Sequence, residues 1–185
     1  MPGFWIAAKD VPPDGRTYVL DDPAVWAEPI AEFDLRMRVS KPLSASVFLL
    51  ARKKGFLARG KLCGEMILLC SRCAEDTLTV IEHNFESFEV FPDAFRKEDE
   101  EKEAGPDAEQ DANVVRNSSH GPEVDLAALL WQELMLVLPV KPLCNVACKG
   151  LCPKCGENLN LKACACAPEE NDPRLAALRG VRIQR

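Results

Sequence analysis

Residues 143–167, LCNVACKGLCPKCGENLNLKACACA, contain six of the nine cysteines of the chain. Cys152 and Cys155 form a CPxCG motif, and Cys164 and Cys166 supply a second pair after a gap of eight residues. A two-residue spacer lets two thiolates face one point, and the glycine permits a tight turn whose amides aim at the sulfurs. Four sulfur ligands at such spacings are typical of tetrahedral zinc.

The remaining cysteines suggest a second site. Cys70 and Cys73 form another CxxC pair far upstream, and Cys144 and Cys148 are the pair left over inside the cysteine-rich stretch. The simplest division is two sites of four cysteines, which are Cys70, Cys73, Cys144 and Cys148 in one and Cys152, Cys155, Cys164 and Cys166 in the other. Shuffled ligand sets are also compatible with the sequence, as is a single zinc bound by the Cys70 pair and two downstream cysteines. Cys63 stands alone in a predicted strand, where we expect a small buried thiol.

Other cysteine chemistries compete with zinc. Nine cysteines is an odd number for a disulfide framework, and the first residues lack the charged and apolar regions of a signal peptide, so we expect a cytoplasmic protein. An iron–sulfur cluster also takes four cysteines, but the CPxCG turn favours one or two zinc ions. A redox dithiol at Cys70 and Cys73 lacks the expected βαβ context. All-cysteine sites are structural and closed, so we expect neither enzymatic activity nor a small-molecule substrate.

Composition is compatible with one main domain and a small appendage. No apolar run approaches the length of a membrane span. The formal net charge is −6, but residues 141–185 carry eight basic and four acidic side chains, so the cysteine-rich end is electropositive. The stretch RKEDEEKEAGPDAEQDA at 96–112 has no apolar periodicity and predicts a disordered loop over about 96–120. We therefore divide the chain into a β-rich main domain, 1–143, and a cysteine-rich segment, 144–185.

Apolar periodicity predicts an α+β fold. Alternating residues indicate a curved, barrel-like antiparallel sheet with strands at 4–8, 16–20, 33–39, 44–52, 56–69 and 77–90. Gly60 and Gly64 are the expected bulge points. A helix at 123–138 carries leucines at helical spacing and is the main packing helix, while shorter helices are expected after Asp22, with Pro29 limiting its length, and at 171–179. The C-terminal segment is predicted to resemble a zinc ribbon.

Several motifs together resemble one known family. These are CSRC at 70–73, VDLAALLWQELMLVLPVKPLC at 124–144, CKGLCPKCGENLNLKACAC at 148–166 and DPRLAALRGV at 172–181. They are similar to the YceD family of large ribosomal RNA subunit accumulation proteins. The resemblance implies a bacterial, cytoplasmic, non-enzymatic protein that acts in ribosome biogenesis. It places the CSRC motif on Cys70 and Cys73 and the CxxxCxGLCPxCGxNLN motif on Cys144, Cys148, Cys152 and Cys155.

Two partner classes follow from this resemblance. A metal-stabilised factor would contact ribosomal RNA or a large-subunit ribosomal protein, and the candidate contact residues are Lys149, Lys154, Lys162 and Arg174. The alternative is a zinc-containing module that binds a basic ribosomal protein through the acidic loop, without direct RNA contact. A thiol redox protein is the weaker alternative.

Overall fold

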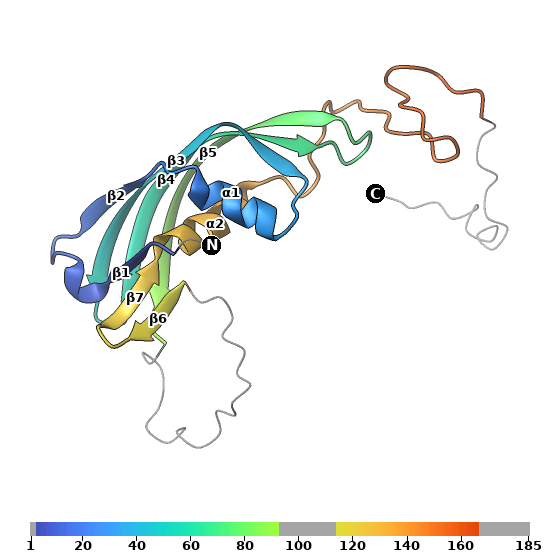
Figure 1. The fold of residues 1–185 in the computed structure, drawn as a ribbon. Helices are drawn as coiled ribbons and strands as arrows, with labels where there is room; N and C mark the ends of the chain where they lie inside the picture. The colour runs from blue at the N-terminus through green and yellow to red at the C-terminus, as the bar shows by residue number, and fades with distance from the viewer. Residues whose placement is uncertain (1–2, 93–113, 167–185) are drawn as a thin grey trace, which may run out of the picture.

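The fold combines two antiparallel sheets and two α-helices in the described residues, 3–92 and 114–166 of a computed structural model (Figure 1). The larger sheet has the order β2 (Arg16–Leu20), β3 (Met37–Arg52), β4 (Gly55–Leu69) and β5 (Asp76–Val90). The smaller sheet has the order β1 (Trp5–Ala7), β7 (Gly121–Asp125) and β6 (Val115–Ser118). The α-helices are α1 (Ala24–Glu32) and α2 (Leu126–Val137), and a short 3-10 helix, η1 (Ala8–Asp10), follows β1. The expected mixed fold with antiparallel sheets is confirmed.

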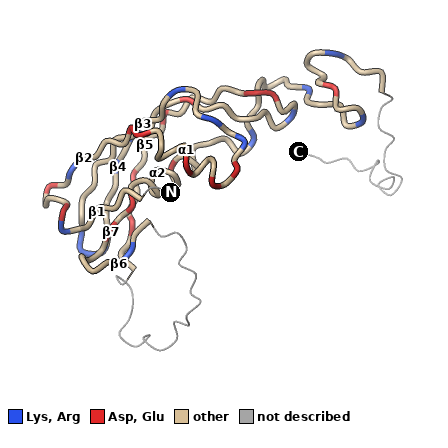
Figure 2. The backbone as a smooth tube through the Cα atoms, viewed as in Figure 1, with Lys and Arg blue, Asp and Glu red and all other residues tan. Residues whose placement is uncertain are grey.

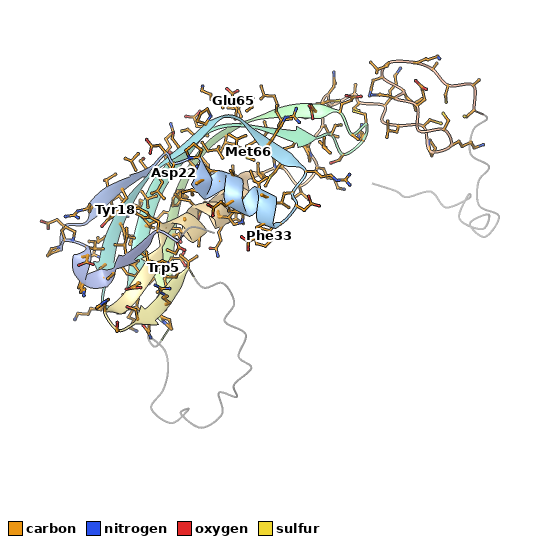
Figure 3. The ribbon with its side chains drawn as sticks, in the orientation of Figure 1. Trp5, Tyr18, Asp22, Phe33, Glu65 and Met66 are labelled. Carbon is orange, nitrogen blue, oxygen red and sulfur yellow. The ribbon has the colours of Figure 1, made fainter. Side chains whose placement is uncertain are left out.

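The larger sheet curves over the two helices, which lie on its concave side (Figure 1). Consecutive side chains of β4 point to opposite faces, as Glu65 and Met66 show in Figure 3, and Met66 is fully buried in the core. The helices complete that core with apolar side chains, among them Trp26, Leu126, Leu129, Leu130 and Leu134. Within the described residues the sheet ends at β2 on one edge and at β5 on the other. The sheet is curved but not closed, so a barrel-like sheet is not confirmed.

The bend arises where β3 crosses Gly64 of β4. The β3–β4 register shifts between Val39 and Lys41 and again before Ser44. Gly64 has φ +154°, and a Cβ there would lie 2.9 Å from the Cα of Leu43, so a side chain would prevent the strands from approaching. The strands predicted at 33–39 and 44–52 are one bent strand, which starts only at Met37.

Gly60 is not a bulge point, contrary to the prediction. It pairs in register with Val47 on one side and Phe85 on the other. A Cβ at Gly60 would lie 2.4 Å from a ring carbon of Phe85, so the glycine leaves room for that ring on the concave face. Packing, rather than a change in strand register, explains this glycine.

Both helices differ from their predicted limits. Pro29 lies inside α1 and is buried, and the helix continues to Glu32, so proline does not end it. The predicted helix at 123–138 begins three residues later, because Glu123 to Asp125 belong to β7. Asp125 is the N-cap of α2 and accepts hydrogen bonds from the amides of Ala127 at 3.0 Å and Ala128 at 3.4 Å.

Part of the predicted disordered loop is ordered. The end of the 96–120 range contains β6, which pairs with β7, and Arg116 and Ser118 both hydrogen-bond across this pair to the Glu123 carboxylate. The Arg116 guanidinium also lies 3.7 Å from the centre of the Trp5 ring. Residues 96–113 and the helix predicted at 171–179 lie outside the described residues. Among the described helices, none has the length and apolar character needed to cross a bilayer.

Candidate metal centre

Two turns with the same backbone geometry present the CxxC pairs. In the β4–β5 turn the Cys70 amide donates to the Glu75 carbonyl at 2.8 Å, and the Ala74 amide donates to the Cys70 carbonyl at 2.9 Å. In the CPxCG turn the Cys152 amide donates to the Glu157 carbonyl at 2.8 Å, and the Gly156 amide donates to the Cys152 carbonyl at 2.9 Å.

In both turns the residue after the second cysteine has a left-handed backbone conformation, with a positive φ angle. Ala74 has φ 58° and Gly156 has φ 74°. This backbone turn is what directs both cysteines of a pair to the same side. The CPxCG motif supplies a glycine at that position, whereas CSRC is followed by alanine.

The eight cysteines gather in two groups. The first cysteine group is Cys70, Cys73, Cys144 and Cys148, and the second cysteine group is Cys152, Cys155, Cys164 and Cys166. Within each group all four sulfurs lie within 4.8 Å of one another. These are the two sets suggested by the simplest division of the sequence. Cys63 belongs to neither and is half-buried rather than buried.

The sulfur spacing fits a tetrahedral metal. Cys70 Sγ lies 3.8 Å from Cys148 Sγ, and Cys73 Sγ lies 3.5 Å from Cys144 Sγ. Sulfurs at the corners of a tetrahedron with metal–sulfur bonds of about 2.3 Å are about 3.8 Å apart. The same distances are far longer than a disulfide bond of about 2.05 Å, and all nine cysteines, each within the described ranges, are free thiols. A thiophilic metal fits this donor set, which is typical of zinc and of iron–sulfur sites.

The charge state of the thiols also suits a cation. Backbone amide hydrogen bonds, chiefly at Cys144, lower the pKa of Cys70 to about 6, and those at Cys155 and Lys154 lower the pKa of Cys152 to about 6. Conversely, the neighbouring thiols raise the pKa values of Cys144 and Cys166 to about 12. Each group thus combines at least one thiol whose pKa is lowered with another whose pKa is raised by its neighbours. A bound cation would offset the repulsion between the sulfurs and hold the ligands as thiolates.

Arg72, inside the CSRC motif, attaches the cysteine-rich segment to the β4–β5 turn. Its guanidinium donates to the Cys148 carbonyl at 2.8 Å, and its own carbonyl accepts from the Leu151 amide at 3.0 Å. The Ser71 amide donates to the Pro142 carbonyl at 2.8 Å. Figure 1 shows the consequence, since the segment lies beyond the end of β4, away from α1 and α2. Sequence analysis missed Arg72, because its carbonyl partners are more than seventy residues away.

The loop between Cys155 and Cys164 makes further contacts that the sequence analysis missed. Asn160 Nδ2 donates to Cys148 Sγ at 3.3 Å, and Asn160 Oδ1 accepts from the Lys149 amide at 2.8 Å. Asn158 Nδ2 donates to a Glu75 carboxylate oxygen at 3.2 Å. Burial raises the pKa of Cys148, but the hydrogen bond from Asn160 and other donors outweigh it, so the pKa is lowered. The NLN tripeptide at 158–160 predicts a reversal of the chain, but it does not predict the hydrogen-bond partners of the two asparagines.

The predicted partner-binding lysines lie on the surface of this segment. Lys149, Lys154 and Lys162 are exposed, and Arg174 lies outside the described residues. Basic residues outnumber acidic ones on the segment, as Figure 2 shows. Two aliphatic side chains are also exposed there, Val146 at 90% and Leu161 at 80%.

The family described as "Large ribosomal RNA subunit accumulation protein YceD" matches residues 58–182. The chain belongs to the YceD family. The match covers the β4–β5 turn and every cysteine of both groups, and it confirms the resemblance seen in the motifs.

Two plant relatives align with most of this YceD-family protein. A protein of Arabidopsis thaliana named large ribosomal RNA subunit accumulation protein YCED homolog 1, chloroplastic, is 29% identical over an alignment of 159 residues that covers 77% of this chain and 49% of the relative. The protein of the same name from Zea mays is 32% identical over an alignment of 149 residues that covers 70% of this chain and 50% of the relative. The chain thus spans about half the length of the curated relatives it matches. No solved structure matches it.

Proposed function

We propose that this YceD-family protein is a non-enzymatic factor in the accumulation of large-subunit ribosomal RNA and in the biogenesis of that subunit. The observation that carries the proposal is the family match over 58–182, together with the names of the two plant relatives. Those relatives are named as chloroplastic, whereas we place this protein in a bacterial cytoplasm. Residues 1–143 form the main domain in this proposal, and residues 144–185 are its cysteine-rich segment.

The proposal includes two structural zinc ions, one in each cysteine group. The support is the spacing of the sulfurs, which matches a tetrahedral site, and the amides aimed at Cys70 and Cys152. Zinc would supply folding energy to a zinc-ribbon-like segment that contains one isolated β-bridge, Leu151 to Asn158, and no described helix or strand. Catalysis is disfavoured because each described metal-competent group consists of four cysteines, which leave no open coordination position.

The exposed lysines favour contact with RNA phosphates. The segment 141–166 carries four lysines and one glutamate and contains no aromatic residue. Lysine suits phosphates, whereas recognition of unpaired bases usually relies on aromatic stacking. We therefore propose backbone contacts made by Lys149, Lys154 and Lys162, with Arg174 as a further candidate.

A protein partner is the second candidate. Val146 and Leu161 are largely exposed beside the lysines, and exposed aliphatic side chains suit a protein surface better than RNA. In this version the acidic stretch at 96–112 engages a basic ribosomal protein of the large subunit. Sedimentation with large-subunit precursors at low and high salt separates the candidates, since counterion release makes phosphate contacts strongly salt-dependent. Replacing Lys149 and Lys162 by alanine should weaken RNA-dependent sedimentation, while Lys53→Ala on the β3–β4 turn should not.

The general function is tested by depleting the protein from its own organism and measuring the ratio of large- to small-subunit ribosomal RNA. The ratio should fall and should recover with the wild-type gene. A Cys73→Ser, Cys152→Ser double variant should rescue poorly, and Cys63→Ser, the same change outside both groups, should rescue fully. An unchanged ratio after depletion would refute the proposed function.

A further inference from the structure

We infer that Asn160 joins the two cysteine groups, so that the first group retains its metal fully only when the second group is folded. This inference rests on the metal sites of the proposed function. Asn160 belongs by sequence to the loop between Cys155 and Cys164 of the second group. Its side chain nevertheless contacts Cys148 of the first group.

Every polar atom of the Asn160 side-chain amide has a partner. Nδ2 donates to Cys148 Sγ at 3.3 Å and to Asn158 Oδ1 at 2.9 Å, and Oδ1 accepts from the Lys149 amide at 2.8 Å. The same Asn158 Oδ1 accepts from the Asn160 backbone amide at 3.0 Å, which fixes the loop conformation. An asparagine amide offers two donors and one acceptor oxygen, so only this orientation satisfies all three contacts.

The contact has consequences for the sulfur because Cys148 is only 4% exposed. An N–H donor stabilises a thiolate and fixes its direction, and the effect is larger where water is excluded. Groups that orient metal ligands in this way typically change metal affinity by about 10- to 100-fold when removed. Asn160 is therefore a positioning residue for the first group.

The second group controls where Asn160 lies. The Leu159 amide donates to the Gly150 carbonyl at 2.9 Å, and Leu151 forms a β-bridge with Asn158, so the loop folds back onto the CKGLC stretch. Cys152, Cys155, Cys164 and Cys166 would close this loop by binding a metal ion. Without that closure the loop would be freer to move, and the Asn160 donor would be withdrawn from Cys148. By thermodynamic linkage the first metal stabilises the second group to the same extent.

Zinc release from the full-length protein to a chromogenic chelator tests this inference. Asn160→Asp keeps the oxygen that accepts from Lys149 but removes the donor to Cys148, and Asn160→Ala removes both without adding charge. Both variants should release zinc from the first group about 10- to 100-fold faster. Asn145→Asp is the matched control, because within the described residues its Oδ1 accepts from the Ala147 amide, at 2.8 Å, and makes no hydrogen bond with a cysteine sulfur. This control should release zinc at close to the wild-type rate.

The Cys166→Ser variant shows which part of the zinc release comes from the first group. It also measures how strongly metal binding by the two groups is coupled. With the second group disabled, the remaining zinc belongs to the first group and should leave faster than in the wild type. Asn160→Asp should then add little, since the two changes remove the same contact. Wild-type release rates in both Asn160 variants, or full additivity with Cys166→Ser, would overturn the coupling. Absence of zinc from the purified wild type would refute the metal sites of the proposed function. This result differs from a failure of the coupling alone, in which zinc is bound but the Asn160 variants release it at the wild-type rate.

Discussion

Two glycines of the cysteine-rich segment allow a direct test of how that segment is attached. Gly150 and Gly156 both have left-handed backbones, with φ +77° and +74°. Their surroundings differ. A Cβ at Gly150 would lie 2.9 Å from the carbonyl oxygen of Arg72, whereas a Cβ at Gly156 would meet nothing within 4 Å. Alanine at either position therefore has the same backbone cost, and only Gly150→Ala also disturbs the β4–β5 turn.

The two costs can be estimated separately. Left-handed alanine costs about 1–2 kcal/mol, and the lower unfolded-state entropy of alanine offsets about 0.5–1 kcal/mol, which leaves about 1 kcal/mol for Gly156→Ala. The Arg72 oxygen is also the acceptor for the Leu151 amide at 3.0 Å, so Gly150→Ala should lose that hydrogen bond. Its loss adds about 1 kcal/mol, for a total of about 2 kcal/mol.

Native-state hydrogen exchange with mass spectrometry measures these effects as local opening. Since about 1.4 kcal/mol corresponds to a tenfold change, Gly150→Ala should reduce protection in peptides covering 70–76 and 148–152 about 30-fold. Gly156→Ala should reduce protection about fivefold, and only around its own turn, while peptides from β3 serve as an internal reference. Equal effects of the two variants on the 70–76 peptide would refute the packing of Gly150 against Arg72.

Three further variants test other parts of the structure. Ala74→Gly removes left-handed strain and should stabilise the β4–β5 turn by about 0.5–1 kcal/mol, measured by hydrogen exchange at 70–76. Asp125→Ala loses the cap of α2 and should lower the free energy of unfolding by about 1–2 kcal/mol in urea titrations. The pKa of Glu123 is lowered by hydrogen bonds, first from Ser118 and then from Arg116. Its contribution to stability is therefore complete above the unfolded-state pKa of about 4.3 and disappears as the pH falls through the lowered folded-state pKa. Glu123→Gln should flatten the acid side of a melting-temperature profile, and a wild-type acid slope in that variant would contradict this.

Local sequence rules predicted much of the sheet and the composition of the cysteine groups. A CxxC spacing determines that two thiols face one point, so Cys70 with Cys73 and Cys152 with Cys155 follow from the sequence. The apolar pattern indicated one long or bent strand at 56–69, which is β4, but the extra residues at the register shifts near Gly64 lie in β3 rather than at the glycine. The simplest division of the remaining cysteines then joined Cys144 and Cys148 to the first pair, and Cys164 and Cys166 to the second. The metal itself stays a prediction.

The misses involve partners that are distant in sequence. Residues 123–125 have helical periodicity with the leucines that follow, but pairing with β1 and β6 places them in a strand. Gly60 has the appearance of a bulge glycine, and only the cross-strand ring of Phe85 explains it. Arg72 and Asn160 carried no motif chemistry of their own, because each acts on Cys148, whose position depends on the folded segment.

Native mass spectrometry of the purified protein tests the central claim most directly, namely that each group of four cysteines binds one metal ion and that the first group attaches the C-terminal segment to the β4–β5 turn. We predict two zinc ions in the wild type, and zinc loss with increased hydrogen exchange at 143–162 in Cys73→Ser and in Cys166→Ser. Cys63→Ser should retain both ions. A wild-type protein without bound metal, or with both ions retained in the Cys73 and Cys166 variants, would contradict the account.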